Sequence, residues 1–281
     1  MAEQTRLLKQ YFGHEAFRDG QKPLIDALLA RRDALGVMPT GAGKSVCYQL
    51  PAMMLPGTTV VVSPLISLMK DQVAALTAMG ISAACINSML SSVEYAQTLY
   101  QAESGAYKVL YVAPERLLTV DFQRLCRAIQ IPLVAVDEAH CVSQWGQDFR
   151  PNYLDIPRFI DGLPQRPVVG AFTATATDAV KADIVKLLAL RDPLCVTTGF
   201  DRPNLFFDVK MPRDKFGWAL DFDQTEDQHD CQKQSKQFLH FSFSFLQFEF
   251  WVNKFLYSNR CFSARHAKID RNEITKEIAR R

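Results

Sequence analysis

The segment that most constrains the fold of this chain is a glycine-rich turn between an apolar run and a helix-like run. The apolar run covers residues 34–38, the turn reads PTGAGKS over residues 39–45, and the helix-like run covers residues 46–54. In such a strand–turn–helix, the backbone N–H groups of the turn and the positive end of the helix dipole converge on one point. The segment therefore predicts an α/β fold with a phosphate-binding turn.

Six residues of this turn are expected to hold a nucleotide. They are Thr40, Gly41, Ala42, Gly43, Lys44 and Ser45. Lys44 reaches the β- and γ-phosphates as a point charge, and the Ser45 hydroxyl ligates Mg²⁺. Met38 stands where the usual motif has its first glycine, so Gly41 and Gly43 supply the backbone flexibility. A surface glycine turn that binds nothing is the alternative interpretation.

Hydrophobic periodicity predicts strands that alternate with helices. Short apolar runs predict strands at residues 58–63, 81–87, 108–113, 132–136 and 168–172. Amphipathic or capped segments predict helices at residues 3–10, 23–32, 64–79, 92–103, 114–130 and 178–190. This alternation is typical of an α/β fold in which helices cover both faces of a parallel β-sheet. The ligand of such a sheet binds at the carboxyl ends of the strands.

A pair of acids follows one of the predicted strands. Asp137 and Glu138 come directly after the apolar residues 133–136. In phosphoryl transfer to water, the first acid of such a pair positions Mg²⁺, and the second orients and deprotonates the attacking water. His140 is expected to couple the acids to a neighbouring loop. The alternatives are two ordinary acids at a strand end and a histidine with a purely structural role.

The composition excludes several other classes of protein. The chain has 281 residues, a formal net charge of +2 and seven cysteines. The net charge neither favours nor excludes a nucleic-acid partner. The cysteine number is odd and no Cys-x-x-Cys pair occurs, which argues against a disulfide framework or a zinc site and predicts reduced cysteines in the core. No signal-peptide or membrane-span pattern occurs, so we expect a cytoplasmic protein.

The character of the sequence changes near Asp214. Strand and helix alternate before it, whereas residues 221–236 are polar and acid-rich, and residues 238–251 alternate phenylalanine with polar residues. The alternation predicts one or two strands with aromatic side chains on both faces. We therefore expect one α/β lobe at residues 1–213 and a divergent, irregular tail at residues 214–281.

Residues 137–151, DEAHCVSQWGQDFRP, closely resemble the DEAH box and the adjoining aromatic-rich loop of RecQ DNA helicases of superfamily 2. Other stretches agree with this family in order and spacing: residues 12–21, 38–52, 61–72, 111–117, 172–177 and 200–205. The resemblance covers about residues 5–213. It implies the first RecA-like P-loop NTPase lobe of an ATP-dependent DNA helicase that unwinds with 3′-to-5′ polarity in DNA repair and recombination.

The resemblance also implies residue roles at the nucleotide. Gln21 would read the adenine edge through its amide, with Phe17 and Arg18 beside it. Thr173 and Thr175 would couple ATP hydrolysis to DNA movement, although an ordinary strand end is the alternative for these two threonines.

Six further residues would contact DNA by the same resemblance. They are Ser63, Lys70, Gln144, Trp145, Phe149 and Arg150. An aromatic face can stack on a base and an arginine can bind a phosphate, which suits single-stranded DNA. Core packing is the alternative for Trp145 and Phe149, and a solvated helix position is the alternative for Lys70.

One part of the family pattern has no counterpart after Asp214. The family's second lobe supplies arginines that stabilise the transferring phosphate, and no Gln-x-x-Gly-Arg-x-Gly-Arg stretch occurs in residues 214–281. We therefore expect a chain that binds ATP and Mg²⁺ more effectively than it hydrolyses ATP or unwinds DNA. We also expect the chain to be a monomer. The alternatives are a catalytically weak module that binds ATP and DNA, and a regulatory fragment.

Overall fold

The computed structural model describes residues 2–146 and 148–199 together with two short strands at 205–206 and 237–238. The chain divides into two units, Met1–Phe200 and Asp201–Arg281. In the second unit, β8 (Leu205–Phe206) and β9 (Gln237–Phe238) pair in parallel. The predicted boundary at residue 213 and nearly all of the predicted aromatic strand lie outside the described residues.

Seven parallel strands form the sheet of the first unit. They are β1 (Ala34–Val37), β2 (Thr59–Val62), β3 (Ala83–Ile86), β4 (Val109–Val112), β5 (Leu133–Val136), β6 (Val168–Thr173) and β7 (Leu194–Thr197). The strand order is β3-β4-β2-β5-β6-β1-β7, and every neighbouring pair is parallel. The predicted parallel sheet is confirmed. The edge strand β7, which alternates between half-buried and exposed residues, was not predicted.

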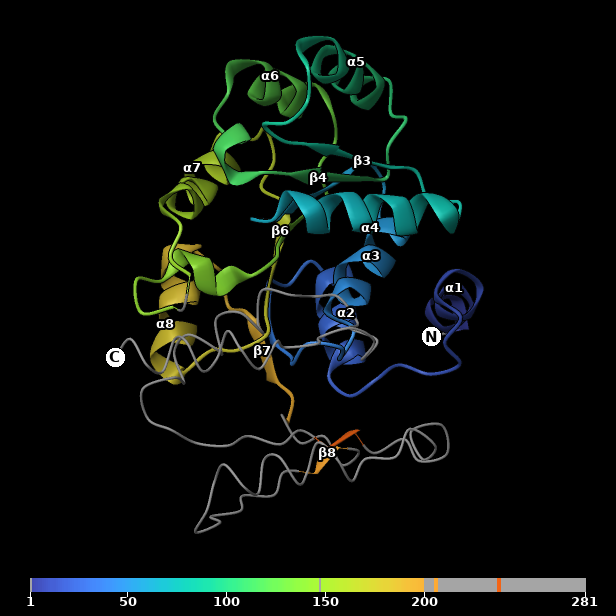
Figure 1. Cartoon of the computed structure of the whole chain (residues 1–281), viewed down its shortest axis with the longest axis vertical. Helices are drawn as coiled ribbons and strands as arrows, with labels where there is room; N and C mark the ends of the chain where they lie inside the picture. Colours follow the sequence, from blue (N-terminus) through green and yellow to red (C-terminus); the bar gives the residue numbers. More distant parts are fainter. Residues whose placement is uncertain (1, 147, 200–204, 207–236, 239–281) are drawn as a thin grey trace, which may run out of the picture. The chain divides into compact units, whose positions relative to one another are not determined.

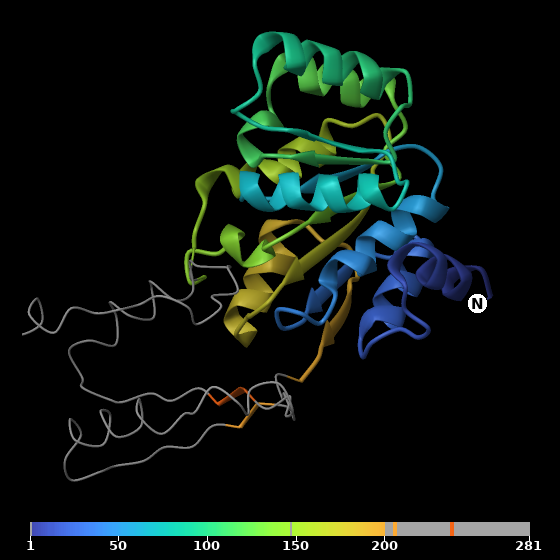
Figure 2. The same ribbon diagram turned by 45° about the vertical axis from the view of Figure 1, so that its right-hand side comes forward.

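Helices cover both faces of this sheet (Figures 1 and 2). The helices on one face are α2 (Gln21–Leu29), α3 (Lys44–Met54) and α4 (Ile66–Ala78), with α1 (Ala2–Phe12) packed beside α3. Those on the other face are α5 (Ser92–Glu103), α6 (Val120–Ala128), α7 (Ile156–Asp161) and α8 (Asp178–Leu187). Because helices cover both faces, the central strands are buried throughout, which explains their continuous apolar sequences.

Two glycines in the sheet make room for large side chains. A Cβ at Gly36 would lie 2.9 Å from a methyl carbon of Leu24, and a Cβ at Gly170 would lie 2.9 Å from the ring of Phe172. The Phe172 ring in turn packs against Tyr48 of α3, with 5.4 Å between the ring centroids. These contacts bring α2 and α3 close to β1 and β6, the strands that lead into the candidate site.

Most of the predicted helices are confirmed, but the single helix predicted at residues 114–130 is wrong. The structure has a 3₁₀ helix, η1 (Pro114–Arg116), followed by α6. Thr119 between them has extended backbone angles, φ −69° and ψ 142°, so the helix restarts after this residue. Two further 3₁₀ helices, η2 (Ala139–Val142) and η3 (Pro151–Asp155), and the helix α7 were not predicted.

A buried ion pair joins three segments at the amino ends of the strands. The Asp33 side chain is 2% exposed and accepts hydrogen bonds from Arg166 at 2.6 and 3.2 Å. It also accepts from the backbone N–H groups of Val169, at 2.9 Å, and Arg191, at 2.7 Å. Asp33 therefore connects the chain before β1 with the starts of β6 and β7. None of the helices in the described part of the chain is long and apolar enough to cross a membrane.

Candidate functional site

The glycine-rich turn lies where β1 ends and α3 begins. Gly41 and Gly43 have φ values of +86° and +83°, a left-handed conformation that glycine adopts without steric penalty. Gly43 is the residue before the first turn of α3, and no side chain caps the helix there. No side chain therefore occupies the N-terminus of α3, the kind of position at which helices bind anions.

Lys44 and Ser45 occupy the first turn of α3, beside the exposed Thr40 and Gly41. The Lys44 ammonium donates a hydrogen bond to the Met38 carbonyl oxygen at 3.2 Å. The ammonium therefore lies at the carboxyl end of β1, within the turn that is predicted to bind phosphate. Phosphate contact by Lys44 and Mg²⁺ ligation by Ser45 stay predictions.

The segment predicted to read adenine contacts the same turn. Gln21 is 1% exposed, and its amide donates to the carbonyl oxygens of Gly43, at 3.0 Å, and Ala42, at 3.3 Å. Its amide oxygen accepts from the Arg18 backbone N–H at 2.8 Å, and the Arg18 guanidinium donates to the Gly41 carbonyl oxygen. Gln21 would have to exchange these partners to read an adenine edge.

Phe17 completes this segment. It packs partly buried against a small apolar cluster that α1, α2 and α3 share. The structure therefore brings Arg18 and Gln21 to the turn, whereas Phe17 packs against this apolar cluster. Contact of these three residues with adenine stays a prediction.

Asp137 lies at the end of β5, buried between its neighbours. Its backbone N–H donates to the Val62 carbonyl oxygen at 2.9 Å, and its carboxylate accepts from the Glu138 backbone N–H at 3.0 Å. Burial, helped by the Glu138 charge, raises the pKa of Asp137 to about 6 against the opposing effects of that hydrogen bond and of Lys44. A buried carboxylate of this kind fits a divalent cation, because Mg²⁺ prefers oxygen ligands and would offset the cost of burying the charge.

Glu138, His140 and Thr173 form a connected group beside Asp137. His140 Nδ1 lies 3.2 Å from a carboxylate oxygen of Glu138 and 2.8 Å from the Thr173 hydroxyl. Burial alone would raise the pKa of Glu138, but the His140 hydrogen bond and the Lys44 charge bring it below its ordinary value. Glu138 is therefore ionised at neutral pH, as a general base must be.

The backbone at Glu138 is unusual. Its φ and ψ are both 47°, the left-handed region that residues other than glycine rarely adopt. Such backbone strain clusters at functional sites. The predicted coupling residue Thr173 lies at the end of β6 and donates to the carbonyl oxygen of the exposed Thr175 at 3.2 Å.

We predict that Asp137→Asn stabilises the protein in the absence of Mg²⁺ and nucleotide. Raising the pKa from 3.8 to about 6 means that the folded protein disfavours the ionised form of Asp137. Stability is therefore lost as pH rises from about 4 to above 6, and the full loss, about 2 to 3 kcal/mol, applies at neutral pH. Urea unfolding at pH 4 and pH 7.5 checks this: the gain of the variant should be small at pH 4 and largest at pH 7.5. Equal free energies of unfolding for the parent and the variant at pH 7.5 would contradict this prediction.

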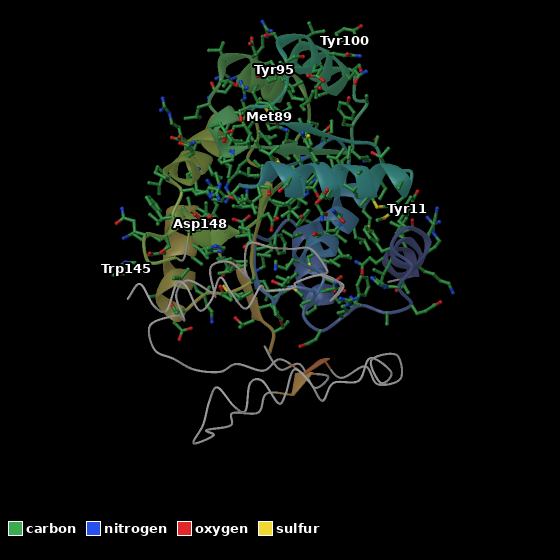
Figure 3. All side chains as sticks on the ribbon, in the orientation of Figure 1. Tyr11, Met89, Tyr95, Tyr100, Trp145 and Asp148 are labelled. Atoms are coloured by element: carbon green, nitrogen blue, oxygen red, sulfur yellow. The ribbon has the colours of Figure 1, made fainter. Side chains whose placement is uncertain are left out.

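Four of the residues predicted to contact DNA, Gln144, Trp145, Phe149 and Arg150, follow η2, and the described residues 143–146 and 148–150 are called the Trp145 loop below. Trp145 is 82% exposed and lies at the outer edge of the view in Figure 3, beside the exposed Gln144, whereas Phe149 is half-buried. Arg150 donates to the Pro64 carbonyl oxygen at 2.8 Å and to the Asp148 carboxylate at 2.8 and 3.0 Å. Trp145 is therefore not a core residue, which removes the alternative interpretation for this side chain. DNA contact by this loop stays a prediction.

The two other candidates for DNA contact differ in exposure. Lys70 is exposed on α4. Ser63 follows β2 and is 1% exposed, and its hydroxyl has no hydrogen-bond partner in the described part of the chain. The Ser63 side chain is therefore not at the surface in this conformation, and DNA contact by both residues stays a prediction.

Sequence reasoning missed several residues that support the site. The Tyr153 hydroxyl donates to the Asp137 carbonyl oxygen at 2.9 Å. Ser143 donates to Asp183 of α8. A Cβ at Gly146 would lie 2.4 Å from the His140 carbonyl oxygen, so the loop folds tightly onto η2. These contacts join residues from separate elements, and no local pattern indicates them.

The sequence model for DEAD/DEAH box helicases matches residues 18–183. The chain belongs to the DEAD/DEAH box helicase family. The matched span contains the glycine-rich turn, the acid pair and Thr173, which the structure brings together.

Within this helicase family, the similarity is to RecQ proteins. The chain is 51% identical over 210 residues to the ATP-dependent DNA helicase RecQ of Bacillus subtilis (strain 168), covering 74% of this chain and 36% of that protein. It is 46% identical over 209 residues to RecQ of Pasteurella multocida (strain Pm70), covering 74% of this chain and 33% of that protein. The predicted RecQ-type first lobe is confirmed. The chain spans about a third of the length of these relatives.

Solved helicase structures share the fold of this chain at low sequence identity. The DUF1998 helicase MrfA matches with a TM-score of 0.60 and 16% identity, covering 99% of this chain and 42% of that chain. A hypothetical ATP-dependent RNA helicase from Sulfolobus tokodaii matches with a TM-score of 0.54 and 16% identity, covering 81% and 66%. These likenesses confirm the RecA-like fold.

Proposed function

We propose that this chain carries the ATP-binding lobe of a RecQ-type DNA helicase that uses ATP to unwind DNA with 3′-to-5′ polarity. The observation that carries the proposal is the connected group Glu138–His140–Thr173 between the glycine-rich turn and the exposed Trp145 loop. That arrangement supports a lobe in which a nucleotide and single-stranded DNA influence one another.

The chemistry follows from the ionised and buried groups of the site. Lys44 exchanges the Met38 carbonyl oxygen for phosphate oxygens, and the Glu138 carboxylate accepts a proton from the attacking water. Ser45 and Asp137 would hold Mg²⁺, which neutralises charge on the phosphates when bound. His140 keeps Glu138 ionised and oriented.

Efficient turnover requires arginines that residues 214–281 do not display in the family's pattern. Such arginines contribute roughly 10³–10⁵-fold to the rate in related enzymes. We therefore propose that residues 1–281 alone bind ATP and DNA but hydrolyse ATP slowly.

The deciding experiment measures ATP hydrolysis by purified residues 1–281 with and without single-stranded DNA. We expect Mg-ATP binding, partial quenching of tryptophan emission by DNA, and turnover at least about 10³-fold below that of a two-lobed RecQ helicase. The Glu138→Gln variant, which keeps the shape of the side chain and removes its charge, is the control for contaminating ATPases. Fast DNA-stimulated turnover that Glu138→Gln abolishes would refute the proposed dependence on a second lobe.

A further inference from the structure

A short chain of hydrogen bonds ties the Trp145 loop to helix α8. The Ser143 side chain is fully buried, and its hydroxyl donates to the Asp183 carboxylate at 2.6 Å. The same hydroxyl oxygen accepts the Trp145 backbone N–H at 3.2 Å. Asp183 is half-buried on α8, whereas the Trp145 indole is exposed. Asp183, 40 residues after Ser143 in the sequence, thus contacts the Ser143 hydroxyl, which in turn contacts the Trp145 backbone.

Further contacts join Gly146 and Arg150 of this loop to η2 and the residue after it. The Gly146 N–H donates to the Ser143 carbonyl oxygen at 3.0 Å, and a Cβ at Gly146 would lie 2.4 Å from the His140 carbonyl oxygen. The Arg150 N–H donates to the Cys141 carbonyl oxygen at 2.9 Å. Both ends of the loop are therefore fastened to η2, and the Asp183 contact fastens the Trp145 end to a different element.

Helix α8 is also connected to the acid pair. It begins at Asp178, directly after the segment 173–177, and the Thr177 hydroxyl caps it by accepting the Val180 N–H at 3.3 Å. At the other end of that segment, the Thr173 hydroxyl lies 2.8 Å from His140. One continuous stretch of chain therefore contacts the Glu138–His140 pair at Thr173 and the Trp145 loop at Asp183.

We propose that Asp183 is a positioning residue that fixes the Trp145 backbone through Ser143 and so transmits shifts of the segment 173–177 to the indole. The inference deepens the proposed function and rests on it for the role of DNA. Asp183 itself acts only through Ser143. Its carboxylate suits this role because a hydrogen bond to an ionised acceptor is shorter and stronger than a neutral one, as the 2.6 Å distance illustrates.

The test uses a background in which Trp145 is the single tryptophan, made by changing Trp218 and Trp251 to phenylalanine. Time-resolved anisotropy of Trp145 is measured without ligand, and affinity for a single-stranded oligonucleotide is measured by titrating Trp145 emission. The variants are Asp183→Ala, Asp183→Asn, Ser143→Ala and the double variant Asp183→Ala/Ser143→Ala. The matched control is Asp178→Ala, which removes an exposed acid from the same helix.

We expect Asp183→Ala and Ser143→Ala each to increase local motion of the indole and to weaken DNA binding about tenfold, which corresponds to about 1.4 kcal/mol. The double variant should be no worse than either single variant, because both break one chain of contacts. Asp183→Asn keeps an acceptor oxygen and should lie between the parent and Asp183→Ala. Asp183→Asn and Ser143→Ala keep the test valid if Asp183→Ala does not fold.

The inference is wrong if Asp183→Ala and Asp178→Ala have equal anisotropy decays, or if the effects of Asp183→Ala and Ser143→Ala add. A change in Trp145 anisotropy without a change in affinity for the oligonucleotide would also overturn it, because the position of Trp145 would then not affect DNA binding. If parental Trp145 emission does not respond to DNA, the proposed function fails instead, while the ligand-free anisotropy still decides whether Asp183 positions the loop.

Discussion

Replacing Lys44 by alanine is expected to weaken Mg-ATP binding by about 100-fold or more. The ammonium lies over the end of β1 within the glycine-rich turn, 3.2 Å from the Met38 carbonyl oxygen. Loss of a hydrogen-bonded charge from an anion site costs roughly 2–5 kcal/mol, and 100-fold corresponds to about 2.7 kcal/mol. Isothermal titration with ATP and Mg²⁺ measures the change directly.

The control for this prediction is Lys186→Ala, which removes an exposed lysine from the last turn of α8. Its ATP affinity should equal that of the parent. The free energy of unfolding of Lys44→Ala should lie within about 1 kcal/mol of that of the parent, because the folded protein loses one hydrogen bond to a carbonyl oxygen. Equal ATP affinity in Lys44→Ala and the parent would refute the phosphate-binding role of the turn.

The largest expected effect on stability comes from Asp33→Ala, which should lower the free energy of unfolding by about 3–5 kcal/mol. The substitution leaves the Arg166 guanidinium, 22% exposed, without its carboxylate partner. It also removes the acceptor of the Val169 and Arg191 N–H groups. Urea unfolding followed by circular dichroism measures the loss.

A surface acid provides the comparison for this second prediction. Asp121 pairs with Arg124 at 3.4 Å while both side chains are more than half exposed, so Asp121→Ala should change stability by less than about 1 kcal/mol. Asp33→Asn keeps one acceptor oxygen and should fall between the parent and Asp33→Ala. If the free energies of unfolding of Asp33→Ala and the parent are equal, the buried ion pair does not stabilise the packing of these strands.

The parallel sheet and most of its helices could be predicted from the sequence because local patterns determine them. Strands buried on both sides are short apolar runs, and the capping box at Ser91 and Glu94 marks the start of α5. The turn and the acid pair were predictable for a related reason, since each directly follows such a run. The helix break at Thr119 and the edge strand β7 were missed because neither has a strong local pattern.

The supporting contacts of the site could not be predicted from the sequence. Asp33 and Arg191 are 158 residues apart, and Ser143 and Asp183 are 40 residues apart. Which distant polar groups meet depends on how helices and strands pack, not on neighbouring residues. The partners of Gln21 illustrate the same limit, because its residue type was predicted to bind adenine, whereas its amide contacts two carbonyl oxygens of the turn.

The strand order has a consequence for communication within the site. The turn follows β1 and the acid pair follows β5, but these strands are not neighbours, because β6 lies between them. At the end of β6, the Thr173 carbonyl oxygen accepts the Met38 N–H on one side, and the Thr173 hydroxyl contacts His140 on the other. The topology thus places β6, which comes later in the chain, between β1 and β5. A change in the distance between the turn and the acid pair would therefore alter the contacts of Thr173.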